Sequence, residues 1–517
     1  MKKLSIGIQT FSKLLEENCI YVDKTNIIHQ LITTGSCYFF SRPRRFGKSL
    51  LVSTLAEIFS GNRKLFSGLA IDSLPYAWEQ HPVVMLSFAG ISYITPENLE
   101  KGIKVKLQDI ANQQAIAVNA ELTPGEMLGS LIKQLAQKNR VALLVDEYDY
   151  AILQHIHNPQ MADAIRETLK NFYSVIKDLD PYLKFVFLTG VSKFPKTSIF
   201  SGLNNLDDIS LDADYNTLLG YTKTEILSYF EEYIIKTANH NKYSTDQLLE
   251  DIKLWYDGYK FTIQENALNV YNPFSVLLLF KKGDFANYWF ETGTPTFLIN
   301  ILKNYDYPMQ EFESIEATQS ELGRFEIKNI PIKALLFQTG YLAIRSYNPT
   351  TKNYVLGYAN KETVDSLSSL ILSSMTHIAE DKFNSVTANL LQIFETSNLP
   401  ALQKTLTTLF AAIPYGIHVS EEKYYQTIFY LLLKMIGANI IVEQQTNIGR
   451  IDAVVETKNS YFIIEFKINS SATKAIAQIE EKKYYEQYQS NNKKITLIGI
   501  AFETTTRNIS SIEYKEM

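Results

Sequence analysis

The 517-residue sequence has few cysteines and no histidine cluster. Its two cysteines, Cys19 and Cys37, both lie in apolar surroundings. This predicts two reduced, buried thiols rather than a disulfide or a zinc site. The seven histidines are scattered and form no metal-ligand spacing. The sequence therefore argues against a secreted domain that is stabilised by disulfide bonds.

Long apolar runs and a strong excess of one charge are also missing. The sequence has no uninterrupted stretch of about 18 apolar residues, the length that a membrane-spanning helix needs. Residues 1–7 lack the apolar run of a signal peptide, so we expect a cytoplasmic protein with no membrane contact. The formal net charge of −5 argues against a wholesale polyanion-binding surface. Any contact with nucleic acid must therefore be local.

The first informative motif is a strand-like run followed by a basic loop and a helix-like run. Apolar residues 37–40 precede a loop that ends in Gly-Lys-Ser, and an apolar helical pattern covers 50–59. This is the context of a Walker A loop, in which backbone N–H groups and a helix N-terminus hold phosphates. Lys48 would reach the β- and γ-phosphates of ATP, and Ser49 would ligate Mg²⁺. We expect nucleotide contacts from five consecutive residues: Arg45, Phe46, Gly47, Lys48 and Ser49.

Arg42 departs from the general Walker A pattern, which has glycine five residues before Gly47. Without that glycine the loop entry lacks the same backbone freedom, which predicts a differently shaped phosphate loop. The alternative is a basic loop that binds no nucleotide. Because Arg42, Arg44 and Arg45 lie beside Lys48, a local phosphate role is favoured over contacts with DNA or a neighbouring subunit.

A second motif supplies the acids that a nucleotide-hydrolysing site requires. The apolar run 141–145 ends in Asp146 and Glu147, which would bind the Mg²⁺ water shell and polarise an attacking water, respectively. Apolar runs at 83–88 and 184–190 predict neighbouring strands of a parallel sheet, with ligands at their C-terminal ends. Thr189 or Ser192 would then sense the γ-phosphate, or would merely cap the following turn.

A third motif lies near the C-terminus, where acids and a lysine interrupt two apolar strand-like runs. Asp452 stands at the head of the first run, and Glu465 and Lys467 close the second. Side chains two residues apart share one face of a strand, so Glu465 and Lys467 would project together. Two carboxylates can hold Mg²⁺ for phosphodiester hydrolysis, and a lysine can stabilise the nucleophile or the developing oxyanion. The alternative is the charged face of an ordinary two-stranded ribbon.

The surroundings of this third motif favour a nuclease fold. Four apolar or aromatic residues precede Glu465, as in a buried central strand, where a charge pair is costly. A helix-like run opens at Glu422, an amphipathic helix surrounds Gln478, and residues 495–502 form an apolar strand pattern. The order helix, strand, strand, helix, strand is that of the restriction-endonuclease-like core.

These runs resemble one architecture known from many bacterial proteins. Residues 21–25, 42–49, 146–149 and 188–194 are similar to successive signatures of an AAA-ATPase-like family. Asp452, Glu465 and Lys467 match the named positions of the PD-(D/E)xK nuclease superfamily, with Asp-Ala in the motif's loose first half. The resemblance implies accessory roles for Glu422 and Gln478. Glu422 is otherwise a helix-terminal acid that favours the macrodipole, and Gln478 a solvated residue.

The predicted fold is therefore α/β with three parts. Residues 1–215 form a P-loop NTPase with a parallel AAA-like sheet, 216–400 a mainly helical lid or adaptor, and 401–517 a restriction-endonuclease-like α/β domain. Thr222 and Glu225 predict a capping box at a helix start in the middle part. Aromatic clusters at 255–259 and 287–293 are interpreted as core rather than as a base-stacking surface.

The sequence favours an ATP-binding and ATP-hydrolysing module coupled to a Mg²⁺-dependent nuclease, with DNA as the expected nucleic-acid partner. One rival is a nucleotide-switched binding or signalling protein whose nuclease-like domain holds nucleic acid or a partner without cutting. A second rival keeps the nuclease but uses ATP binding for assembly alone. The sequence leaves homo-oligomerisation and the choice between DNA and RNA open.

Overall fold

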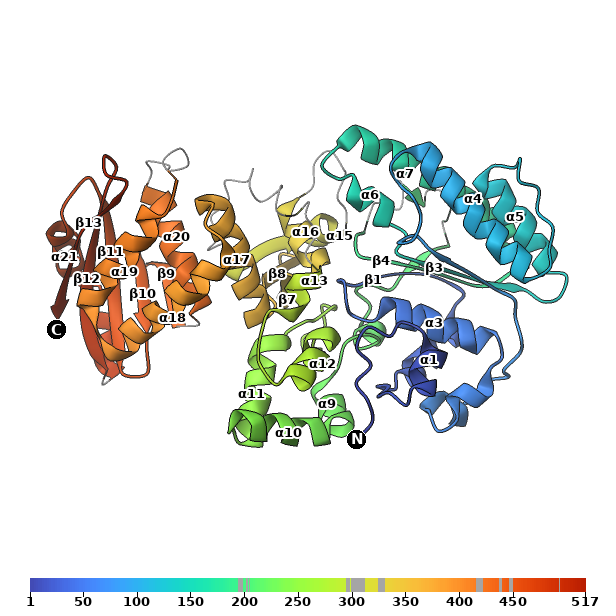
Figure 1. Ribbon diagram of the computed structural model, residues 1–517, viewed down its shortest axis with the longest axis horizontal. Helices are drawn as coiled ribbons and strands as arrows, with labels where there is room; N and C mark the ends of the chain where they lie inside the picture. The colour runs from blue at the N-terminus through green and yellow to red at the C-terminus, as the bar shows by residue number, and fades with distance from the viewer. Residues whose placement is uncertain are drawn as a thin grey trace. The chain divides into compact units, whose positions relative to one another are not determined.

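A computed structural model gives the fold of the chain (Figure 1). It describes residues 1–193, 199–200, 203, 205–293, 298, 312–323, 331–414, 422–436, 439–445, 450–491 and 493–517. The chain divides into two compact units, Met1–Phe297 with Glu313–Thr363 and Leu298–Phe312 with Val364–Met517. Helix α17 (Lys361–Thr376) spans the point where the first unit passes into the second. Within the described ranges, no helix is long and apolar enough to cross a membrane.

A five-stranded parallel sheet forms the centre of the first unit. Its strands are β1 (Cys37–Ser41), β2 (Val83–Ser87), β3 (Val141–Asp146), β4 (Leu183–Gly190) and β5 (Asp207–Asp208). The order β2-β3-β4-β1-β5 places β4 between the two strands that carry the nucleotide motifs. Every residue of β3 is buried, which explains its uninterrupted apolar sequence. The predicted parallel sheet is confirmed.

Helices cover both faces of this sheet. In Figure 1, α1 and α3 lie on one face, and α4, α5 and α7 pack together over the other. Thr95, Thr123 and Asn158 cap α4, α5 and α7, each followed by proline at the helix start. The helices are α1 (Phe11–Glu16), α2 (Thr25–Thr34), α3 (Lys48–Phe59), α4 (Pro96–Gln113), α5 (Pro124–Leu135), α6 (Tyr150–Gln154) and α7 (Pro159–Ser174). Cys19 and Cys37 are both buried thiols, as predicted.

The remainder of the first unit is mainly helical. The helices are α9 (Lys223–Tyr229), α10 (Glu231–Asn241), α11 (Thr245–Tyr256), α12 (Pro273–Lys282), α13 (Tyr288–Gly293), α15 (Gln319–Gly323) and α16 (Ile332–Thr339). The predicted capping box of Thr222 and Glu225 begins α9. An antiparallel sheet in the order β6-β8-β7 was not predicted; its strands are β6 (Ile315–Thr318), β7 (Leu342–Asn348) and β8 (Asn353–Tyr358). Tyr288 and Trp289 are buried, in agreement with a core role for the aromatic cluster.

The second unit holds a mixed five-stranded sheet between helices. The strands β9 (Asn439–Gln445), β10 (Arg450–Glu456), β11 (Ser460–Ile468), β12 (Lys494–Glu503) and β13 (Asn508–Glu516) lie in the order β13-β12-β11-β10-β9. Only the β11–β12 pair is parallel among them. Figure 1 shows α21 on one face and α18, α19 and α20 on the other. The helices are α18 (Glu380–Thr396), α19 (Leu399–Ala411), α20 (Glu422–Met435) and α21 (Ala472–Glu481).

This sheet has two more strands than the sequence predicted. The predicted order contained α20, β10, β11, α21 and β12, and the structure adds β9 before β10 and β13 after β12. Both additional strands are edges, and β13 is largely exposed, so its sequence lacks the apolar run of a buried strand. The predicted elements therefore correspond to the middle of the sheet and its covering helices.

Gly499 on β12 allows α21 to approach the sheet closely. A Cβ atom at this position would collide with the carbonyl group of Ala472 and would crowd Ala475, both in α21. Gly499 is paired with Glu465 of β11. The missing side chain therefore brings α21 against the part of the sheet that carries Glu465.

Candidate functional site

The loop between β1 and α3 has the form of a phosphate-binding loop. Gly47 has a φ of +98° and caps α3, which begins at Lys48. The nearest atom to a Cβ built on Gly47 is Leu219 Cδ2 at 3.9 Å, so the left-handed backbone rather than crowding favours glycine. The first N–H groups of α3 lack intrahelical acceptors, which makes this end of the helix suitable for an anion.

The Lys48 side chain folds over this loop. Its amine donates hydrogen bonds to the carbonyl oxygens of Arg42 and Pro43, both at 2.9 Å, and only 6% of the residue is exposed. Burial lowers the pKa of Lys48, and the nearby carboxylates of Glu147 and Asp146 oppose that shift. A phosphate in the loop would compete with two neutral carbonyls for this amine, which favours the charged ligand.

Arg42 does not have the phosphate role that its position suggested. Its guanidinium lies over the rings of Phe40 and Phe261, at 4.2 and 4.0 Å from their centroids. It donates hydrogen bonds to the carbonyls of Ser41, Ser210 and Tyr215. Burial lowers the pKa of Arg42 to about 9. Arg42 is thus a structural residue that ties the loop entry to segment 210–215.

Replacing Arg42 with methionine should destabilise the chain, because the carbonyls of Ser210 and Tyr215 would lose their partners. We expect the free energy of unfolding to fall by about 3 kcal/mol. Urea denaturation followed by circular dichroism would measure this loss. Arg140→Met is the control, because Arg140 is exposed. An Arg42→Met chain as stable as wild type would contradict the structural role.

The end of β3 brings the two predicted acids beside the loop. Burial raises the pKa of Asp146, and a hydrogen bond with the Ser49 hydroxyl opposes that shift. Among the described residues, the buried Oδ1 atom of Asp146 has no hydrogen-bond partner. The Ser49 hydroxyl and this carboxylate are hard oxygen donors, so the site fits Mg²⁺ held partly by water and phosphate. The structure therefore brings Ser49, Asp146 and Lys48 together.

Glu147 occupies a strained backbone position at the same end of the sheet. Its φ is +55°, which is uncommon for a residue other than glycine and is frequent at functional sites. Burial raises the pKa of the Glu147 carboxyl. Thr189 at the end of β4 is fully buried, and its hydroxyl has no hydrogen-bond partner within the described part of the chain. Both groups are placed at the C-terminal edge of the sheet, where a nucleotide phosphate is expected.

Asp149 fixes this edge, and no role was predicted for it from the sequence. Its buried Oδ2 atom accepts hydrogen bonds from the backbone N–H groups of Ser192 at 2.6 Å and Val191 at 3.1 Å. The Tyr148 hydroxyl donates to the Ser192 carbonyl at 2.9 Å. The segment after β3 is therefore bound to the segment after β4. The acidic run 146–149 was the only available signal, and it did not separate Asp149 from its neighbours.

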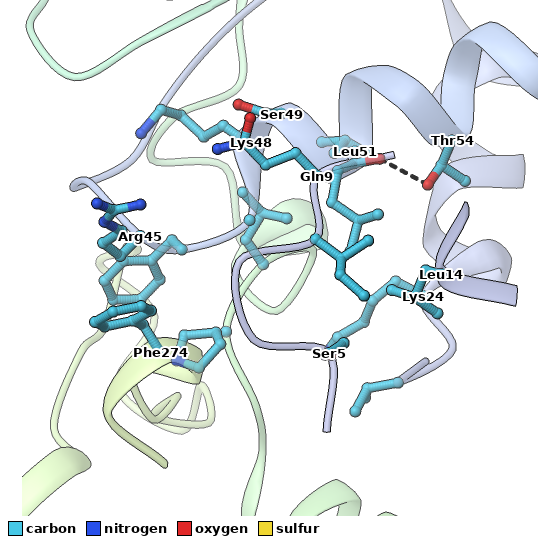
Figure 2. Close-up of a pocket in the computed structure, with 18 of the residues that line it drawn as sticks. Ser5, Gln9, Leu14, Lys24, Arg45, Lys48, Ser49, Leu51, Thr54 and Phe274 are labelled. Carbon is cyan, nitrogen blue, oxygen red and sulfur yellow. Dashed lines mark hydrogen bonds between the residues drawn. The ribbon is translucent and has the colours of Figure 1, made fainter. Parts of the chain in front are cut away.

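A cavity of about 320 Å³ extends from the phosphate loop into the helical part of the first unit (Figure 2). One end contains Arg44, Arg45, Lys48 and Ser49, and Arg45 lies over the Phe274 ring. Residues 5–9, 218–221 and 273–277 supply much of the remaining wall. These segments carry no phosphate-binding motif, so sequence reasoning did not connect them with the nucleotide site.

The second candidate site lies on β10, β11 and α21. The register pairs Ala453 with Ile464, so Asp452 on β10 stands level with Glu465 on β11. Asp452 Oδ2 accepts a hydrogen bond from the backbone N–H of Phe466 at 2.8 Å. Lys467 Nζ lies 3.1 Å from Glu465 Oε1. The strand pairing and the two-residue repeat thus gather Asp452, Glu465 and Lys467.

Gln478 completes this group from α21. Its amide donates a hydrogen bond to the same Glu465 Oε1 atom that receives Lys467. Glu465 is only 2% exposed, and about a quarter of the Lys467 side chain is exposed. Two donors on one oxygen atom fix the orientation of this buried carboxylate. The group is thus held in one arrangement and open to solvent on the lysine side.

Two carboxylates are a ligand set that fits Mg²⁺, which commonly binds one or two acids and keeps several waters. No group of three or more histidine, cysteine, aspartate or glutamate residues suited to a metal occurs within the described ranges. The remaining ligands would then be water and substrate. Glu422 begins α20, but its side chain lies outside the described residues, as does Gly449 at the start of the motif.

Comparison with known proteins agrees with the two kinds of domain. Residues 5–200 match a family described as a predicted AAA-ATPase, and residues 420–512 match the PD-(D/E)XK nuclease superfamily. A protein of Azotobacter chroococcum mcd 1, described as "Uncharacterized protein in vnfD 5'region", is 39% identical over 523 residues, covering 98% of each chain. The chain belongs to the AAA-ATPase-like family that carries a C-terminal PD-(D/E)XK nuclease domain.

The assignment to this AAA-ATPase-like family applies to nearly the whole chain and not only to its two ends. The similarity to the Azotobacter protein extends through the helical region that neither family model matches. The α/β fold, with its parallel N-terminal sheet and its mixed C-terminal sheet, agrees with both families. The two family descriptions imply enzymatic domains. Together they imply the use of a nucleotide and of a divalent metal.

Proposed function

We propose that this protein binds and hydrolyses ATP and uses its C-terminal domain to cleave phosphodiesters, with DNA as the substrate. The observation that carries the nuclease proposal is the convergence of Lys467 and Gln478 on the buried Glu465, level with Asp452 on the next strand. An isolated charge pair on a solvated ribbon would not bury its acid among apolar residues.

Each residue of the nuclease group has a definite task. Asp452 and Glu465 would hold Mg²⁺, which supplies an activated water and neutralises charge on the phosphate. Lys467 presents a cation on the solvent side, where it stabilises the attacking oxygen or the developing oxyanion. Gln478 donates to Glu465 and so fixes the orientation of that carboxylate, which makes it a positioning residue.

The nucleotide proposal is carried by Lys48, Ser49 and the acids of β3. Lys48 and the N-terminus of α3 would bind the β- and γ-phosphates, and Ser49 with Asp146 would hold Mg²⁺. Glu147 would accept a proton from the attacking water, and its raised pKa suits a general base. Thr189 would contact the γ-phosphate.

A nuclease assay over a panel of substrates tests the whole proposal. Single- and double-stranded DNA and RNA would each be incubated with the full-length protein, with and without ATP and Mg²⁺. We expect Mg²⁺-dependent cleavage of DNA that changes with ATP. A protein that cleaves no nucleic acid under any of these conditions, yet binds it, would instead support a nucleotide-switched binding function.

A further inference from the structure

A buried ion pair lies at the end of the nucleotide cavity that is remote from the phosphate loop. Lys24 Nζ donates hydrogen bonds to both carboxylate oxygens of Glu225, at 2.6 and 2.7 Å. Only 10% of the Lys24 side chain and 21% of the Glu225 side chain are exposed. Bidentate geometry with little exposure distinguishes this pair from the solvated ion pairs of the surface.

The pair joins two segments that both contribute to the cavity wall, and of the two partners only Lys24 lines the cavity. Lys24 lines the cavity and caps α2, in the segment that follows β-bridge residue Cys19. Glu225 lies in the first turn of α9, directly after the cavity-lining residues Gly220 and Tyr221. Its Oε2 atom also accepts the backbone N–H of Thr222 at 2.7 Å. The carboxylate is therefore held by the N-terminus of its own helix and also binds Lys24 in the N-terminal segment.

Two further hydrogen bonds join the same two segments. The backbone N–H of Asp23 donates to the Tyr229 hydroxyl at 3.3 Å, and the Tyr233 hydroxyl donates to the Lys2 carbonyl at 2.7 Å. Helices α9 and α10 are thus bound to the N-terminal segment by these hydrogen bonds and by an ion pair between the Met1 amine and Glu232 at 3.4 Å. Among these, only the Lys24 link uses charged groups at the cavity wall.

The cavity differs in character between its two ends. The loop end holds the cationic residues Arg45 and Lys48, whereas the N-terminal segment that contains Lys24 contributes the apolar lining residues Leu14, Ile20, Val22 and Ile28. Figure 2 shows Lys24 and Leu14 on the side of the cavity away from Arg45 and Lys48. Because Glu225 neutralises Lys24, this end offers no net charge to a triphosphate. Its lining suits the flat, largely apolar face of a nucleobase.

We propose that the Lys24–Glu225 pair is a positioning element that closes the nucleoside end of the cavity and so sets the affinity for the nucleoside part of ATP. The inference rests on the proposed nucleotide-binding function and extends it. Breaking the pair would let the wall formed by 218–221 separate from the N-terminal segment, which weakens contacts with base and ribose. The phosphate contacts at Lys48 and Ser49 would persist.

Equilibrium binding of two ligands to the full-length protein tests this inference. Isothermal titration calorimetry with Mg²⁺ would compare ATP with inorganic tripolyphosphate, which has no nucleoside. Lys24→Met and Glu225→Gln should each weaken ATP binding about ten-fold and leave tripolyphosphate binding unchanged. Lys170→Met is the control, because it breaks an exposed ion pair with Glu167 on α7, away from the cavity lining. It should bind ATP like the wild type.

The outcomes separate this inference from the proposed function. Lys48→Ala should lose affinity for both ligands, because it acts at the phosphate end. If Lys24→Met and Glu225→Gln bind ATP as tightly as wild type, or lose both ligands in parallel, the inference is wrong. If the wild-type protein binds neither ligand, the proposed nucleotide function fails and the inference fails with it.

Discussion

Asp452→Asn should reduce phosphodiester cleavage on the order of 10³-fold without unfolding the second unit. The asparagine carbonyl oxygen can still accept the hydrogen bond from the Phe466 N–H, so the contact between β10 and β11 is retained. The variant loses the negative charge that Mg²⁺ requires from this strand. Initial rates on the preferred DNA substrate, together with circular dichroism of the purified chain, would measure the two effects separately.

Other variants of the same group should lower the cleavage rate by smaller factors, which tests this prediction further. Lys467→Met removes the cation and should cost about 10²- to 10³-fold in rate. Gln478→Ala leaves both acids in place and should cost about 10- to 100-fold, as for other residues that orient a metal ligand. Glu503→Gln is the matched control, because Glu503 is an exposed acid at the end of β12. If Asp452→Asn cleaved DNA at the wild-type rate, the assignment of this group as a nuclease site would be wrong.

Glu147→Gln should lower ATP turnover by about 10²- to 10⁴-fold and leave ATP binding intact. Glutamine has the shape of glutamate but cannot take a proton from the attacking water. The substitution leaves unchanged the proposed phosphate contacts of Lys48 and the proposed metal ligands Ser49 and Asp146. Phosphate release would report turnover, and calorimetry would report affinity. Glu100→Gln, an exposed acid of α4, is the control.

The result for Glu147→Gln also distinguishes two uses of ATP. If turnover falls while cleavage of DNA persists with bound ATP, nucleotide occupancy alone permits cutting. If both fall together, hydrolysis is coupled to cutting. Turnover that equals the wild-type rate would show that Glu147 is not the general base, in line with ATP binding that serves assembly.

The sequence predicted those parts of the fold in which one local pattern determines the structure. Strand β3 is buried on both faces, so its apolar run and terminal acids were visible without any knowledge of the neighbouring strands. Gly47 and the helix that begins at Lys48 follow from a short motif with a known backbone requirement. Glu465 and Lys467 share one face of a strand because of its two-residue repeat.

The missed features depend on contacts between distant segments. Arg42 looked like a phosphate ligand, but its actual partners are the Phe261 ring and the carbonyls of Ser210 and Tyr215. The cavity wall at 218–221 and 273–277 has no motif of its own and is recognised only from its place in the fold. Edge strand β13 is too exposed to show an apolar run. Such contacts carry no periodic signal along the chain.

Gly499 shows that the absence of a side chain at one position can determine the geometry of a neighbouring reactive group. The residue carries no reactive group and lies on a strand that contributes none of the proposed ligands, yet it sets how near α21 can come to Glu465. A methyl group there would push Gln478 outward while every acid and base kept its identity. A related protein could have the equivalents of Asp452, Glu465, Lys467 and Gln478 but a larger residue in place of Gly499. It would thus retain the motif, but its polar groups would be aligned differently.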